Sequence, residues 1–138
     1  MEVRPGRSAT VRIVRDRVYG EVDLSASAAE LNRLAGAVAG GEGLLRSTAG
    51  PGGEHLAGVE VTKGAGPGVR IRLDASRGIL VISGDEAARA VLADNLRAMA
   101  AAGDGGHLHL DHFPGHPYLA EGSVPLVVNS PHGGMPAR

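Results

Sequence analysis

Two stretches of this chain repeat the same pattern at an offset of 58 residues, and this repeat strongly limits the folds open to it. In each stretch, apolar residues first alternate and then recur three and four residues apart, which predicts two strands followed by a helix. Between residues 11 and 38, nine of the 28 positions are identical to the positions 58 residues further on. The alternative is a chance match in a chain rich in alanine and glycine.

The first copy predicts a hairpin over residues 11–24 and then a helix. Ser27 and Glu30 have the spacing of a capping box at a helix start. Gly40-Gly41 ends the helix, because glycine readily adopts the left-handed conformation found there. The Gly-rich residues 41–54 predict a long loop, which in a compact domain is often mobile or functional.

The second copy follows a strand expected near residues 56–62. It predicts a hairpin over residues 69–83 and a helix that begins with a second capping-box spacing, Ser83 with Glu86. Gly103 ends this helix. Short apolar stretches near 108–110 and 126–128 predict two further strands.

The resulting element order is ββαβ-ββαβ, which predicts an α+β fold. The two strands of a hairpin pair antiparallel, and each helix must bury its stripe of apolar residues. We therefore expect a mostly antiparallel sheet of about six strands with both helices on one face. A chain of 138 residues supports one core. We therefore expect a single domain over 1–138, ordered from about 10 to 128, with flexible termini at 1–9 and 129–138.

Composition excludes several functional classes. The chain has no cysteine, so disulfides, cysteine zinc sites and thiol nucleophiles are impossible. No apolar run is long enough to span a membrane, and the N-terminus lacks a signal-peptide core, which favours the cytoplasm. A net charge of -1 argues against nucleic-acid binding. Gly64–Gly68 precedes a strand rather than a helix, so it does not qualify as a phosphate loop.

The strongest functional signal is a cluster of histidines and aromatic residues between His107 and Tyr118. On a strand, side chains alternate, so His107, His109 and Asp111 share one face. Two imidazoles and a carboxylate on one face can hold a divalent metal or perform acid–base chemistry. The interpretation we favour is simpler, namely a solvated or partner-binding sheet face with no cofactor.

The residues that follow this strand form a stiff Pro-Gly bend. His112, His116 and Tyr118 lie close in sequence and offer a further ligand, base or proton donor. Phe113 shares the alternation of the histidines, so it is a candidate interface anchor or pocket wall. The alternative is that Phe113 and Tyr118 fill the core of an aromatic-poor protein.

Residues 107–128, from His-Leu-His-Leu-Asp-His through Phe-Pro-Gly-His-Pro-Tyr to Leu-Val-Val, resemble the C-terminal signature of the immunity protein 32 family. Members of that family are small bacterial proteins of polymorphic toxin systems. The resemblance implies a cytoplasmic protein that binds a toxin and neutralises it. The resemblance assigns no role to any individual residue.

Two functions follow from these observations. The first is an immunity-like binding protein whose surface includes His112, Phe113, Tyr118 and the 41–54 loop, and whose partner is a toxin. The second is a small enzyme, with or without a metal, that acts on a small-molecule substrate, as in a biosynthetic pathway. Its catalytic groups are His107, His109, Asp111 and His116, of which the first three are the candidate metal ligands. Neither function involves nucleic acid or a membrane, and an exposed final strand leaves pairing with a second copy open.

Overall fold

The computed structural model describes residues 11–16, 20–48, 54–102 and 106–129, which hold two helices and eight strands. The helices are α1 (Ala28–Gly40) and α2 (Glu86–Ala101). The strands are β1 (Val11–Arg15), β2 (Val22–Ala26), β3 (Gly43–Arg46), β4 (Gly58–Lys63), β5 (Val69–Asp74), β6 (Ile79–Gly84), β7 (His107–Leu110) and β8 (Leu126–Asn129). The terminal segments 1–9 and 130–138, which we expected to be flexible, lie outside the described residues. Asn129, placed in that C-terminal segment from the sequence, is part of β8.

The strands form two four-stranded sheets, ordered β1-β2-β8-β7 and β3-β4-β6-β5. Each sheet consists of two antiparallel strand pairs that are joined by one parallel pair. The parallel pair is β2 with β8 in the first sheet and β4 with β6 in the second. The α+β class is therefore confirmed, whereas a single sheet of about six strands is wrong. The alternation of apolar residues predicts where strands lie, but it does not encode which strands from the two halves of the chain become neighbours.

The loop predicted over residues 41–54 is also wrong in part, because it contains β3. Leu44 and Leu45 are too short an apolar stretch to show strand alternation in a Gly-rich setting. The strand forms because Leu45 is buried opposite Val59 of β4. Each half of the chain is consequently ββαββ rather than ββαβ.

The two halves share one geometry in their hairpins. Ile13 pairs with Leu24 in β1–β2, and Ile71 pairs with Ile82, 58 residues further along the chain, in β5–β6. The first residues of the two helices, Ala28 and Glu86, are separated by the same offset. The repeat seen in the sequence thus corresponds to a repeat in structure.

The helix ends follow local chemistry. As predicted, the Ser27 side chain caps α1 by accepting from the Glu30 N–H at 3.2 Å, and Gly41 at φ +82° ends the helix. The predicted start of the second helix at Ser83 is wrong. Asp85 is its N-cap and accepts from the Ala88 N–H at 3.2 Å. An aspartate caps a helix as well as a serine does, so the capping-box spacing matched two residues too early.

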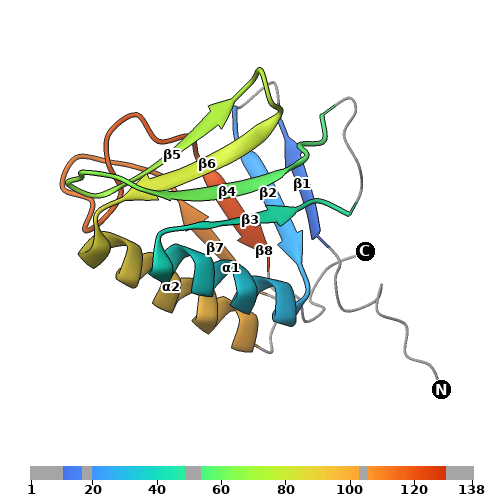
Figure 1. Ribbon diagram of the computed structural model, residues 1–138, viewed down its shortest axis with the longest axis horizontal. Helices are drawn as coiled ribbons and strands as arrows, with labels where there is room; N and C mark the ends of the chain where they lie inside the picture. Colours follow the sequence, from blue (N-terminus) through green and yellow to red (C-terminus); the bar gives the residue numbers. More distant parts are fainter. Residues whose placement is uncertain (1–10, 17–19, 49–53, 103–105, 130–138) are drawn as a thin grey trace.

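A single apolar core joins both sheets to both helices. Figure 1 shows α1 and α2 lying side by side on one side of the strands. Each helix turns a leucine stripe inward, with Leu34 of α1 and Leu92 of α2 fully enclosed. Burying each such side chain contributes about 1.5–3 kcal/mol. Among the described residues, neither helix is long and apolar enough to cross a membrane.

The connections from β3 to β4 and from β7 to β8 run along the outer strands of the opposite sheets. The Leu56 N–H donates to the Ile13 carbonyl at 2.9 Å, and the Val124 N–H donates to the Ile71 carbonyl at 2.7 Å. The second connection also pairs Val69 with Leu119. The Val124 bond and the Val69–Leu119 pairing hold the β7–β8 connection, which contains the later part of the histidine and aromatic cluster, against β5.

Candidate functional site

The first part of the histidine cluster lies on β7, which forms one edge of its sheet. His107 and His109 are exposed, whereas Leu110 is buried and Leu108 is half-buried. The centroids of the two imidazole rings are 6.1 Å apart. Asp111 follows the strand directly and is also exposed.

His107 is part of a polar network that crosses three strands. Its Nδ1 lies 2.6 Å from Oδ1 of Asn129 on β8. The Asn129 amide nitrogen lies 3.1 Å from the Ser25 hydroxyl and 3.3 Å from the Asp23 carboxylate on β2. Because these oxygens accept from the amide nitrogen, Asn129 turns its own oxygen to His107, which donates from Nδ1.

The structure gives the metal interpretation no geometric support. Within residues 11–16, 20–48, 54–102 and 106–129, no group of three His, Asp or Glu side chains is arranged to hold a metal ion. His107, His109 and Asp111 are all exposed, and they do not form such a group. His107 instead donates to Asn129, as described above.

The second part of the cluster is a bend that the N–H groups of its own backbone stabilise. His116 Nδ1 accepts from the Tyr118 N–H at 3.1 Å and from the Leu119 N–H at 3.0 Å. Its imidazole is therefore neutral and carries its hydrogen on Nε2. Partial burial lowers the pKa of His116, the nearby His112 lowers it further, and Asp111 opposes both effects.

Four rings cluster on this bend, which we call the aromatic bend (His112, Phe113, His116 and Tyr118). His116 is its centre, with ring centroids 4.8 Å from Phe113, 4.9 Å from Tyr118 and 6.5 Å from His112. Tyr118 packs against the core, and its hydroxyl accepts from Asn95 of α2 at 2.9 Å. Burial raises the pKa of Tyr118, and the bond from Asn95 opposes this rise. Phe113 is 53% exposed, so it does not fill the core.

The other surface proposed from the sequence, the 41–54 loop, lies at the edge of the second sheet as β3. Leu44 on this strand is 51% exposed. Residues 49–53 of the segment lie outside the described residues. His55 lies after this segment and forms an isolated bridge to Val14 of β1.

Sequence reasoning missed the residues that hold His107 in place. The sequence predicts a flexible tail from residue 129, and it gives no functional role to Asp23 or Ser25. Leu126, Val127 and Val128 form a continuous buried apolar run, so no alternation in the sequence indicated that the strand extends to Asn129. No pattern in the sequence indicated that β8 would pair with β2.

Known proteins add one finding to this geometry. The model of the immunity protein 32 family matches residues 79–131. This segment runs from β6 past the end of β8 and includes β7 and the whole aromatic bend. The resemblance seen in residues 107–128 is thereby confirmed. Comparison with curated proteins gives no match, and neither does comparison with solved structures.

Proposed function

We propose that this protein is an immunity-like binding protein that neutralises a cognate toxin by direct association, with the aromatic bend at the centre of the contact. The observation that carries the proposal is the exposed Phe113 on a bend that lies inside the family match. The chain has only three aromatic residues, and this one is turned toward solvent. Aromatic side chains that a partner can enclose often supply most of the binding energy of an interface.

The aromatic bend is pre-organised for such a contact. Pro114 and Pro117 restrict its backbone, and His116 ties the two ends together through its own N–H bond to the Phe113 carbonyl at 2.9 Å and the two bonds to Nδ1. A rigid segment loses little conformational entropy when it binds. Phe113 can therefore meet a partner without reorganisation of the surrounding chain.

The free edge of β7 supports a second part of the same interface. Within the described residues, β7 pairs with β8 alone, so its other side offers unpaired backbone groups. A strand from a partner can pair with such an edge. His107, His109 and Asp111 lie beside it and are exposed rather than enclosed in a cavity. Their exposure favours a recognition surface over the alternative of a small enzyme.

The proposal predicts a toxin gene beside the gene for this chain, and the direct test is calorimetry of the purified chain with the product of that gene. Phe113→Ala should weaken binding by about tenfold or more, which corresponds to at least about 1.4 kcal/mol. Asn32→Ala is the control, because Asn32 is exposed on α1, outside both the aromatic bend and β7. Equal binding by Phe113→Ala and the unaltered protein would contradict the proposal.

A combined variant tests the β7 edge separately. Replacing His107, His109 and Asp111 by alanine should weaken toxin binding and reduce protection of cells that express the toxin. Urea unfolding of the same variant shows whether the loss of the Asn129 contact has altered the fold. If this folded variant protects cells fully, the interface does not include the β7 edge.

A further inference from the structure

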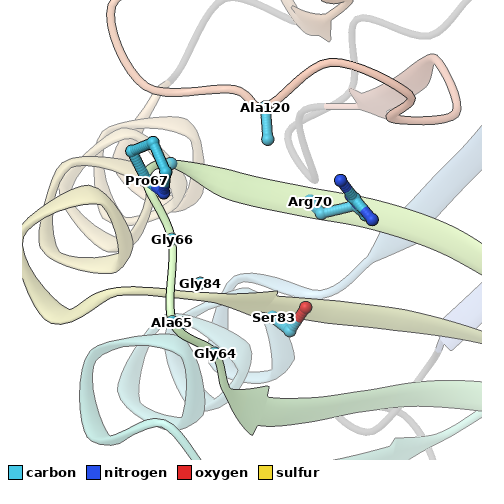
Figure 2. A pocket seen from close by; sticks show the side chains of 9 residues that line it. Gly64, Ala65, Gly66, Pro67, Arg70, Ser83, Gly84 and Ala120 are labelled. Carbon is cyan, nitrogen blue, oxygen red and sulfur yellow. The ribbon is translucent and has the colours of Figure 1, made fainter.

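A hollow of about 230 Å³ lies on the second sheet, beside the segment that follows the aromatic bend. The connection from β4 to β5 (Gly64–Gly68) forms one wall. The start of β5 and the end of β6 form the floor. Figure 2 shows this connection beside the two strands, with Arg70 and Ser83 on the floor. The volume is several times the roughly 30 Å³ that one water molecule occupies in the liquid.

Arg70 and Ser83 are cross-strand neighbours on the floor of this hollow. Both side chains stand on the same face of the sheet (Figure 2). Arg70 is exposed and, within the described part of the chain, its guanidinium has no acceptor. Arg77, in the turn at the other end of the β5–β6 hairpin, differs because it forms ion pairs of 2.8 Å with both Asp74 and Glu60. Arg70 therefore contributes an uncompensated positive charge to the hollow.

The wall adds further hydrogen-bond donors. Within the described residues, the N–H groups of Ala65 and Gly66 donate to no acceptor, unlike the Gly64 N–H, which donates to the Gly84 carbonyl at 2.9 Å. The Ser83 hydroxyl offers another donor, and Arg70 is the one charged residue among the described residues that line the hollow. A site with an unpaired guanidinium and several free donors favours an anion.

The glycines around the hollow have a packing role that does not explain Arg70. A Cβ on Gly64 would lie 2.9 Å from the Gly84 nitrogen, and a Cβ on Gly84 would lie 2.7 Å from the Gly68 carbonyl oxygen. These glycines let two segments of backbone approach closely. The direction of the Arg70 side chain is independent of that requirement.

One acidic group lies close behind the wall. The Asp85 carboxylate accepts from the Gly68 N–H at 2.7 Å and from the Ala88 N–H at 3.2 Å. These bonds lower the pKa of Asp85, so the carboxylate is ionised and already occupied as the cap of α2. Asp85 does not line the hollow, but its negative charge repels an anion there. Binding of an anion must therefore depend on the positive charge of Arg70.

We propose that this hollow binds a small oxyanion, a carboxylate or a phosphate, held by the Arg70 guanidinium and the Ser83 hydroxyl. A planar guanidinium can donate two parallel hydrogen bonds to either group. The site does not use a helix N-terminus, since Asp85 caps that end of α2. It is also separate from the toxin-binding proposal, which depends on Phe113.

The surroundings allow the oxyanion to come from either of two sources. A larger hollow of about 450 Å³ adjoins the site, shares Arg70 with it and reaches His116, Tyr118 and Glu121. A free small anion would occupy the floor beside Ser83. A carboxylate side chain of a bound protein would enter through this larger hollow, from the side of the aromatic bend.

The test is a titration of the full chain with inorganic phosphate and, separately, with acetate at constant ionic strength, followed by amide and guanidinium NMR signals. Saturable shifts at Ala65, Gly66 and Arg70 are expected, with a dissociation constant of about 1 mM, near −4 kcal/mol. Saturation by phosphate alone identifies a phosphate-type ligand, and saturation by acetate identifies a carboxylate. Absence of saturation by either anion would overturn the proposal.

Three variants make the result specific to the site. Arg70→Gln should weaken binding about tenfold, and Ser83→Ala should weaken it by about threefold. Arg72→Gln is the matched control, because Arg72 is exposed on the same face of β5 but does not line the hollow. Equal losses in Arg70→Gln and Arg72→Gln would show only general charge attraction and would overturn the proposal. Phe113→Ala should leave the titration unchanged, whatever its effect on toxin binding.

Discussion

His107 Nδ1 lies 2.6 Å from Asn129 Oδ1, and this contact joins the edge strand β7 to β8. The Asn129 amide nitrogen extends the connection to Ser25 and Asp23 on β2. The position of the histidine at the sheet edge is thus coupled to a strand from the first half of the chain.

Replacing Asn129 by alanine should lower the free energy of unfolding by about 1 kcal/mol, because the hydrogen bonds to β2 and to His107 are lost together. Urea unfolding measures the change. The matched control is Asn32→Ala, at an exposed position of α1 where alanine favours the helix, so no loss is expected. If both variants unfold at the wild-type urea concentration, the network contributes nothing to stability.

The bend should depend on the acceptor at His116 Nδ1. In His116→Asn, the side-chain oxygen can take the place of Nδ1 and accept from the Tyr118 and Leu119 N–H groups. In His116→Gln, the amide lies one bond further out and the two bonds are lost. Amide hydrogen exchange at residues 118 and 119 should therefore accelerate in the glutamine variant and change less in the asparagine variant. Equal rates in both variants would contradict this role.

The pKa of His116 predicts a pH effect of definite sign. Its folded value is lowered from the usual 6.5, so the unfolded chain takes up the proton first as the pH falls. Stability is therefore fully present above pH 6.5, decreases between 6.5 and the lower folded pKa, and stays constant below it. Ring carbon signals in an NMR titration give the folded pKa directly. A titration midpoint above 6.5 would show that burial does not control this group.

The Asp74 carboxylate should titrate far below its usual range. The Arg77 side chain is the main cause, with Ser76 second, and together they lower the pKa of Asp74 to about 2. Since the unfolded pKa is near 3.8, this pair stabilises the fold above that pH, and its contribution is lost as the pH falls toward 2. Arg77→Gln should raise the Asp74 pKa, as measured by carboxyl carbon NMR. Arg97→Gln, at a distant exposed pair with Asp94, should leave it unchanged.

A buried arginine links the two helices. Arg89 of α2 is 5% exposed and donates to the carbonyls of Val38 and Ala39 at the end of α1 and of Gly84 before α2, at 2.9–3.0 Å. Arg89→Met keeps much of the volume but leaves these carbonyls without a donor, and it should cost about 2 kcal/mol or more in urea unfolding. Arg97→Met, at an exposed position of the same helix, is the control. Equal stability of the two variants would contradict the linking role.

The candidate site was predicted from the sequence only in its local features. The alternation from His107 to Leu110 indicated which side chains share a face, and the burial pattern of β7 agrees with it. The stiff bend around Phe113 followed from its prolines. The contact from His107 to Asn129 and the separation of the bend into a core-packed Tyr118 and an exposed Phe113 depend on distant strands and on α2. No pattern within the segment itself encodes those neighbours.

The sequence by itself determined the two helices, the Ser27 cap and the two hairpins with their common 58-residue offset. These features depend on residues within a few positions of one another, where side-chain spacing and backbone preference act directly. Only the tertiary structure decided that β2 would pair with β8 and β4 with β6, so that two sheets form instead of one. Burial of both leucine stripes in one shared core favours that pairing, and this energy arises between segments far apart in the chain.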